Sequence, residues 1–162
     1  MEQKSEGQTD SAQHVKWSTS YSTGIQLIDD QHKGLIHFVN ELMNHVKESQ
    51  EEDRDYFLGV INEVVKYSKN HFFTEEKYML ATRFPGYDEH KKTHDEFVEK
   101  VNKVVMDFDA GEKMELKDIV CFLKDWVLVH VAGQDKLYAQ YFRDIATRKD
   151  DGKLTVSKTD VE

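Results

Sequence analysis

Residues 116–145 read LKDIVCFLKDWVLVHVAGQDKLYAQYFRDI and carry the clearest pattern in the chain. Apolar side chains recur here at the three- and four-residue spacing that places them on one face of an α-helix. They are Leu116, Ile119, Val120, Leu123, Trp126 and Val127, followed by Tyr138, Phe142 and Ile145. The stretch therefore predicts a long amphipathic helix whose apolar face packs against a core.

Three further stretches show the same period, at residues 25–46, 57–79 and 90–108. The breaks between the four stretches are short, and short connections make successive helices antiparallel neighbours. The sequence thus predicts an all-α fold, an up-down-up-down four-helix bundle. We expect the bundle to span residues 17–147, between a flexible N-terminal arm at 1–16 and a polar C-terminal tail at 148–162. Trp17 and Tyr21 are expected to fold back onto the bundle.

Composition narrows the range of partners. Lysine and arginine number 22 against 31 aspartates and glutamates, a net charge of −9 with histidines neutral. This balance argues against nucleic-acid binding, which needs positive charge, and it favours a monomer. No apolar run is long enough for a membrane span or a signal-peptide core. Cys121 is the single cysteine, so no internal disulfide can form, and we predict a cytoplasmic protein.

Polar residues interrupt the apolar faces where Leu or Val would be expected. A single histidine on such a face is usually a hydrogen-bonded core residue. Here five of the eight histidines follow the pattern, together with one glutamate, and they come from all four predicted helices. Burying that many imidazoles without partners would cost several kcal/mol each. A shared metal site explains the set, which comprises His32, His71, Glu75, His90, His94 and His130.

The spacing of His130 and Asp135 predicts a local irregularity. The two residues are five apart, which an ideal α-helix splays by about 140°. The apolar stripe also resumes one residue late after His130. A π-helical turn aligns residues five apart, and such turns cluster at functional sites. We therefore predict a π-turn between residues 129 and 136, around Gly133, which brings Asp135 into the set.

The number of candidate ligands predicts two metal ions. His71 with Glu75, and His90 with His94, are four residues apart and project from one helix face. Five imidazoles and two carboxylates are too many for one ion, and the set lacks the thiolates of most structural zinc sites. Five imidazoles, two bridging carboxylates and one bridging oxo or hydroxo group fill eleven of the twelve positions of two octahedral ions. One position stays open for a small ligand.

These motifs resemble the hemerythrin family, and specifically the bacterial hemerythrins. The resemblance covers about residues 15–145, and all seven ligand positions of the family are present. It implies two iron ions per chain, cycling between Fe2+ and Fe3+ and joined by an oxo or hydroxo bridge. The quoted motifs are Trp17, GIQLIDDQHK at 24–33, HFFTEE at 71–76, HKKTH at 90–94 and HVAGQDKLY at 130–138.

The resemblance also assigns roles to the seven residues. Three histidines would fill one iron, two would hold the other iron, which keeps the open position, and two carboxylates would bridge both. Dioxygen would bind reversibly at the open iron, so the protein would carry, store or deliver oxygen to an oxygen-consuming recipient and would not be an enzyme. The histidines that would fill the first iron are His90, His94 and His130. His32 and His71 would hold the second iron, and Glu75 and Asp135 would bridge both.

Apolar residues beside these ligands are expected to line a dry dioxygen pocket. Water and protons would otherwise leave the irons oxidised. No acidic or hydroxyl-bearing residue is evidently placed to supply protons, and the Glu-x-x-His motif of ferritin-like oxidases is absent from the chain. Both points favour carriage over oxidation. The expected lining residues are Leu35, Phe72, Trp126, Val127 and Val131.

Three alternatives remain open at this stage. The same site suits a stand-alone sensor of oxygen, nitric oxide or redox state, and it suits a di-iron enzyme that consumes peroxide or nitric oxide. Metal storage or a zinc bundle is disfavoured, because a structural site needs no open position. The other histidines, His14, His37 and His45, are expected at the periphery. Cys121, nine residues before His130, is expected on the opposite face of its helix.

Overall fold

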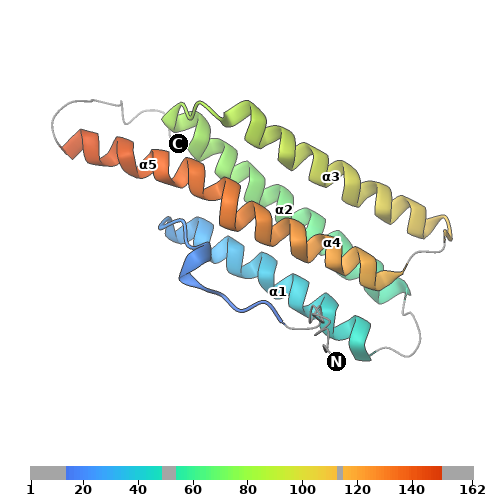
Figure 1. Ribbon diagram of the computed structural model, residues 1–162. Helices are drawn as coiled ribbons and strands as arrows, with labels where there is room; N and C mark the ends of the chain where they lie inside the picture. The colour runs from blue at the N-terminus through green and yellow to red at the C-terminus, as the bar shows by residue number, and fades with distance from the viewer. Residues whose placement is uncertain (1–13, 49–53, 113–114, 151–162) are drawn as a thin grey trace, which may run out of the picture.

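The computed structural model describes residues 14–48, 54–112 and 115–150. Over these residues the chain forms four antiparallel helical rods (Figure 1). Because α4, η2 and α5 follow one another without a gap and make up one rod, the predicted four-helix bundle is confirmed. The elements are the 3-10 helix η1 (Thr19–Tyr21), α1 (Gln26–Glu48), α2 (Arg54–Thr82), α3 (Tyr87–Asp109), α4 (Leu116–Val129), the π-helical turn η2 (His130–Gln134) and α5 (Asp135–Asp150).

The turn between α2 and α3 follows from its local sequence. Arg83 adopts a positive φ of 54°, which ends α2. The amide of Phe84 then donates to the carbonyl of Met79 at 2.9 Å, the long-range bond of a Schellman-type helix end. Asp88 and Glu89 lie in the first turn of α3, where their negative charge suits the positive end of the helix dipole. The chain therefore reverses within a few residues, as predicted.

The fourth rod contains the predicted irregularity. Residues His130–Gln134 form a π-helical turn, and the amide of Asp135 donates to the carbonyl of His130, five residues earlier. The prediction from the register slip is therefore confirmed. Beyond the turn α5 continues to Asp150, which is farther than the apolar stripe indicated and three residues into the segment expected as a tail.

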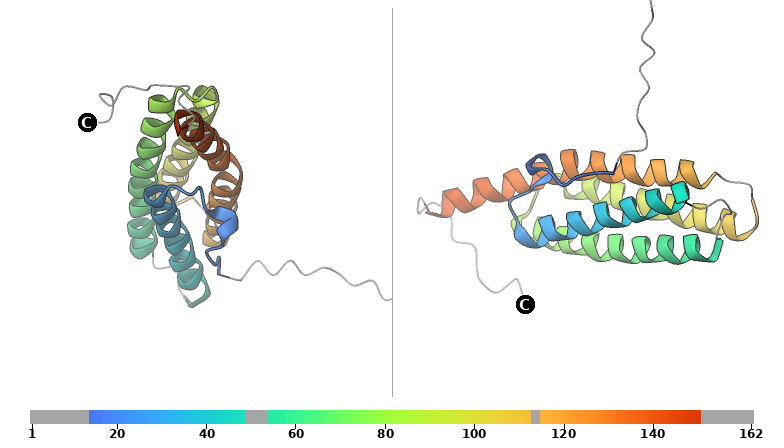
Figure 2. Two further views of the ribbon diagram at one scale, coloured as in Figure 1. Left: turned by 90° about the vertical axis from the view of Figure 1, so that its left-hand side faces the viewer. Right: turned by 90° about the horizontal axis from the view of Figure 1, so that it is seen from below.

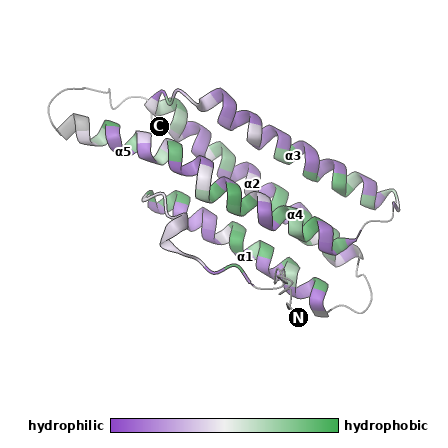
Figure 3. Cartoon of the chain, in the orientation of Figure 1, coloured by the Kyte–Doolittle hydropathy of each residue, from purple (hydrophilic) through white to green (hydrophobic). Residues whose placement is uncertain are grey.

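Apolar residues fill the bundle in two separate clusters. The larger cluster includes Leu42, Phe57, Phe97 and Leu123 and occupies the part of the bundle nearer the α1–α2 connection. The smaller cluster consists of Ile28, Met79, Tyr138 and Ala139 at the other end. The residues of α4 are the most hydrophobic on average, green in Figure 3, whereas those of α3 are largely hydrophilic. None of the helices in the described ranges is long and apolar enough to cross a membrane.

The segment before α1 lies along the bundle, as Figure 2 shows. The amide of Val15 donates to the Asn40 side chain at 2.8 Å, and that side chain donates back to the Val15 carbonyl at 2.9 Å. Trp17 and Tyr21 are partly buried against the core, so both fold back as expected. Helix η1 also contacts the π-turn η2. Most of the predicted arm, residues 1–13, lies outside the described ranges, as do residues 151–162 of the predicted tail.

Candidate metal centre

The seven predicted ligand residues meet in the gap between the two apolar clusters. They come from all four rods, because α1 contributes one, α2 two, α3 two and the fourth rod two. Each is at least 95% buried, which is unusual for so many polar side chains. The sequence pattern therefore located a single buried cluster. Its members are His32, His71, Glu75, His90, His94, His130 and Asp135.

Three histidines form one half of the cluster. The Nε2 atoms of His94 and His130 lie 3.0 Å apart. His94 Nε2 is 3.2 Å from Glu75 Oε2, and His90 Nε2 is 3.6 Å from the same oxygen. These three imidazoles and Glu75 thus point four donor atoms, all within 4.8 Å of one another, at one position. We refer to them as the three-histidine group.

Two histidines form the other half. His32 Nε2 lies 3.0 Å from Asp135 Oδ2, and His71 Nε2 lies 3.5 Å from Glu75 Oε1. The His32 and His71 rings meet edge to face with centroids 4.9 Å apart. Together with the two carboxylates they form a second set of four donors within 4.8 Å of one another. This two-histidine group has one imidazole fewer than its neighbour.

The two carboxylates link the groups because their oxygens face opposite ways. Glu75 turns Oε1 toward His32 and His71 and Oε2 toward His90, His94 and His130. Asp135 turns Oδ2 toward His32 and Oδ1 toward His90 and His130, the latter at 2.9 Å. Each carboxylate therefore offers one oxygen to each half, which is the arrangement of two bridging ligands.

The donor atoms fit two metal ions on physical grounds. Seven buried atoms of the cluster lack a hydrogen-bond partner among the described residues, including His32 Nε2, His71 Nε2 and both Asp135 oxygens. Such orphaned groups are costly unless a cation binds them. A metal–nitrogen bond of about 2.1 Å and a right angle between ligands would place neighbouring donors roughly 3 Å apart. Several observed separations, 2.9 to 3.2 Å, match this spacing. The cluster fits a di-iron site.

Three residues that were not predicted as site residues contact the Nδ1 atoms of the imidazoles, on the side away from the cluster. The Nδ1 atom of His71 lies 3.1 Å from Gln31 Oε1, and that of His130 lies 2.9 Å from Gln134 Oε1. The Nδ1 atom of His94 lies 3.1 Å from Glu76 Oε1. A hydrogen bond at Nδ1 turns Nε2 toward the cluster and fixes the ring. The quoted motifs GIQLIDDQHK, HFFTEE and HVAGQDKLY contain all three residues, but only the packing of separate rods pairs Gln31 with His71 and Glu76 with His94.

A buried hydroxyl contacts the cluster, although the sequence indicated no hydroxyl-bearing residue placed to supply protons there. The Tyr138 hydroxyl donates to Glu75 Oε1 at 2.8 Å, and the side chain is only 2% exposed. Burial and the nearby negative charge of Glu75 raise the pKa of Tyr138 well above its ordinary value. The hydroxyl therefore keeps its proton and acts as a fixed donor to the carboxylate. The sequence analysis interpreted Tyr138 as a core residue, because its apolar ring follows the stripe.

The buried charges shift one another's pKa values. Burial alone lowers the pKa of His130, but the negative charge of Asp135 and the close oxygens of both carboxylates raise it to about 10. His32 behaves in the same way, and its pKa rises to about 9. Burial dominates at His71 and lowers its pKa to about 4. Burial opposes ionisation of Glu75, yet the surrounding imidazoles hold its pKa well below the usual range.

The five residues expected to line a dioxygen pocket belong to the larger apolar cluster or pack against it. Four of them are at least 97% buried, and Trp126 is partly exposed. Phe72 stacks on the His94 ring with centroids 3.9 Å apart, and Trp126 stacks on the His130 ring at 4.4 Å. The two aromatic residues therefore also hold imidazoles of the three-histidine group in place. The four buried residues are Leu35, Phe72, Val127 and Val131.

The remaining histidines and the cysteine lie away from the cluster. His14 contacts Asn44 on the exposed surface of α1, and the exposed His37 lies 3.6 Å from Glu41. His45 is partly exposed near the end of α1 and stacks on Tyr56. Cys121 is a partly exposed free thiol. These positions agree with the peripheral roles expected for them.

Comparison with known proteins identifies the family. The hemerythrin HHE cation-binding domain model matches residues 23–142. The chain is 33% identical to a bacteriohemerythrin of Stenotrophomonas maltophilia, across 76% of this chain and 78% of that protein. It is 30% identical to a hemerythrin of Themiste dyscrita, across 75% and 88% of the two chains. A wild-type hemerythrin crystal structure superimposes with a TM-score of 0.72 at 27% identity, covering 79% and 97% of the two chains. The chain therefore belongs to the hemerythrin family.

Proposed function

We propose that this protein binds dioxygen reversibly at a di-iron centre and serves to carry, store or deliver it. In this proposal the three-histidine group holds one iron and the two-histidine group holds the other. Glu75 and Asp135 would each offer one oxygen to each iron. The iron centre supplies the electrons that dioxygen takes up on binding and returns on release. The open position belongs to the half of the cluster that has fewer ligands, beside His32 and His71.

The observation that carries the proposal is the asymmetry of the cluster. Each carboxylate turns one oxygen toward each half, so only the number of imidazoles differs between the halves, three against two. Two metal ions of equal coordination number would therefore leave their vacancy on the two-histidine side. A buried vacancy of one position suits a diatomic ligand better than a larger substrate.

The chain's own residues favour release of the ligand over its reduction. Leu35, Phe72, Val127 and Val131 present only apolar atoms and keep water away from the cluster. The Tyr138 hydroxyl donates its hydrogen bond to Glu75, and it keeps its proton because its pKa is raised. The protein thus offers little water and no readily released phenolic proton at the centre. Both features support reversible binding.

Replacing His71 tests the placement of the open position. His71→Ala removes one of only two imidazoles at the proposed oxygen-binding iron, while the bundle keeps its apolar clusters. Loss of a residue that only hydrogen-bonds to a metal ligand costs roughly 10–100-fold in metal affinity or activity. Because His71 is itself a proposed ligand, we expect oxygen binding to fall by more than that. The matched control is His37→Ala, which removes an exposed imidazole on α1. Oxygen binding is measured by optical titration of the reduced iron-loaded proteins, with helix content checked by circular dichroism.

The outcome separates the proposal from its alternatives. An unchanged oxygen affinity in a folded His71→Ala protein would contradict the assignment. Sustained consumption of peroxide or nitric oxide with a reductant would indicate an enzyme instead. The cytoplasmic location, the monomeric state and an oxygen-consuming recipient remain our predictions, and the free thiol of Cys121 is compatible with the first.

A further inference from the structure

The outer partners of the imidazoles differ in charge. His71 and His130 each contact a neutral glutamine amide at Nδ1, whereas His94 contacts the carboxylate of Glu76. An ionised carboxylate only accepts hydrogen bonds, so His94 Nδ1 carries the hydrogen, and its Nε2 lone pair is free for the cluster. Hydrogen bonds to a charged acceptor are also roughly twice as strong as neutral ones. Among the three observed outer contacts, only that of His94 involves an acidic side chain.

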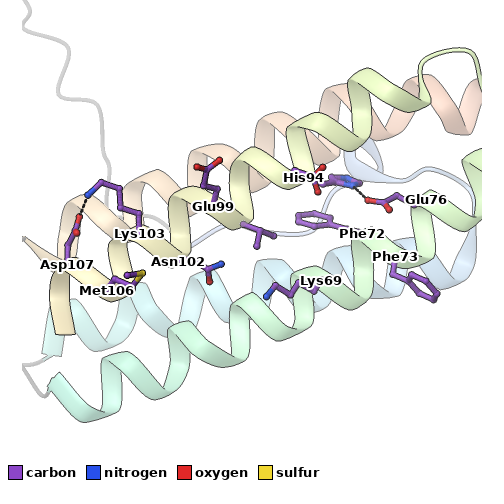
Figure 4. A pocket seen from close by; sticks show the side chains of 12 residues that line it. Lys69, Phe72, Phe73, Glu76, His94, Glu99, Asn102, Lys103, Met106 and Asp107 are labelled. Carbon is purple, nitrogen blue, oxygen red and sulfur yellow. Dashed lines mark hydrogen bonds and ion pairs between the residues drawn. The ribbon is translucent and has the colours of Figure 1, made fainter. Parts of the chain in front are cut away.

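Glu76 lies between the buried cluster and a groove open to solvent. Its neighbour Glu75 points into the core, and the rotation of about 100° per helical residue turns Glu76 toward α3 instead. The Glu76 side chain is 19% exposed, against 2% for His94. A groove of about 700 Å³ between α2 and α3 is lined by Glu76, His94 and Phe72, and Figure 4 shows the contact from Glu76 to His94 in it. Solvent therefore reaches the charge directly behind one proposed iron ligand.

A fixed negative charge beside a redox centre favours the oxidised state. Oxidation of iron raises the positive charge of the centre, and Coulomb attraction to a nearby carboxylate grows with that charge. A glutamine in the same place accepts the same hydrogen bond without the net charge. Phe72 stacks on the face of the His94 ring, and this contact restrains rotation of the ring away from Glu76.

We propose that Glu76 is a positioning residue that fixes His94 through Nδ1 and lowers the reduction potential of the three-histidine side. This inference rests on the proposed di-iron centre and adds a residue that sets its reduction potential. The carboxylate at the groove shifts the balance of the centre toward the oxidised state. The groove exposes the Glu76 carboxylate to solvent, whereas the Gln31 amide that contacts His71 is buried.

Glu76→Gln isolates the charge because it keeps the side-chain shape and an acceptor oxygen. In the iron-loaded protein we expect its reduced form to be favoured by about tenfold relative to the parent, equivalent to about 59 mV for a one-electron step. Glu99→Gln is the matched control, since Glu99 lines the same groove and its loss changes the net charge equally. We expect less than a twofold change in the control. Both values come from spectroelectrochemical titration without oxygen.

A second readout does not depend on iron chemistry. In the zinc-loaded, 15N-labelled protein, the Nδ1 proton of His94 should resonate upfield in Glu76→Gln relative to the parent, while those of His71 and His130 stay in place. A potential shift in Glu76→Gln no larger than that in Glu99→Gln, or an unmoved His94 proton, would overturn the inference. Failure of reversible oxygenation would instead overturn the proposed function, because neither readout uses oxygen.

Discussion

Two imidazoles of the centre face carboxylate oxygens at close range. His32 lies 3.0 Å and His130 lies 2.9 Å from an oxygen of Asp135. Their raised pKa values, about 9 and about 10, mean that both carry protons near neutral pH when no metal is bound. These protons offset the buried carboxylate charge in the metal-free bundle. Metal binding must displace them, so metal affinity should fall as the pH decreases.

The same shifts predict how the stability of the metal-free protein depends on pH. The raised pKa values of His32 and His130 contribute stability that is complete below their ordinary value of 6.5 and is lost as pH rises through about 9 to 10. The lowered pKa of His71 contributes stability that is complete above 6.5 and is lost as pH falls through about 4. The free energy of unfolding, measured by urea denaturation, should therefore be greatest near pH 6.5.

A variant without the responsible carboxylate provides the control. Asp135→Asn removes the charge that raises both histidine pKa values, so the loss of stability between pH 7 and 10 should become much smaller. An equally steep alkaline loss in Asp135→Asn would show that other groups cause it.

At the scale of the helices, two local features set the geometry of the centre. The π-turn η2 aligns His130 with Asp135, and Gln134 within it reaches back to His130 at 2.9 Å. On α1, Gly34 follows His32 by two residues and lies against the Tyr67 side chain of α2. A Cβ atom added at Gly34 would collide with the Tyr67 hydroxyl and ring. The missing side chain at Gly34 therefore leaves room for the Tyr67 ring of α2 to lie against α1 beside His32.

Two glycine substitutions distinguish close packing from helix propensity. Gly34→Ala should lower the free energy of unfolding by about 1–3 kcal/mol, because overpacking against Tyr67 outweighs the gain in propensity. Gly59→Ala, in the exposed interior of α2 with nothing within 4 Å of the new Cβ, should raise it by about 0.5–1 kcal/mol. Urea denaturation of both metal-free variants measures the two changes. A stabilising Gly34→Ala would contradict the tight contact between Gly34 and the Tyr67 side chain.

At the scale of the whole molecule, the centre divides the apolar core into two clusters, and this division explains how far the sequence could be interpreted. The apolar stripes that His32, His71 and His130 interrupt can be recognised in the sequence alone, because each helix repeats its inward face every three or four residues. The π-turn was predictable for the same reason, since it shifts that repeat by one. The outer contacts were not, because Gln31 meets His71 and Glu76 meets His94 only through the packing of separate rods.

The reversible binding of one dioxygen by two irons, held in the paired halves of this cluster, is the proposal on which the others depend. Its most direct test is an optical titration of the anaerobically reduced, iron-loaded protein with oxygen, followed by removal of the oxygen and a metal assay. We predict about two irons per chain and a charge-transfer band that appears with oxygen, saturates at one dioxygen per pair of irons and disappears when oxygen is removed. A colourless zinc protein, or immediate conversion to an oxidised form that does not release oxygen, would contradict the claim.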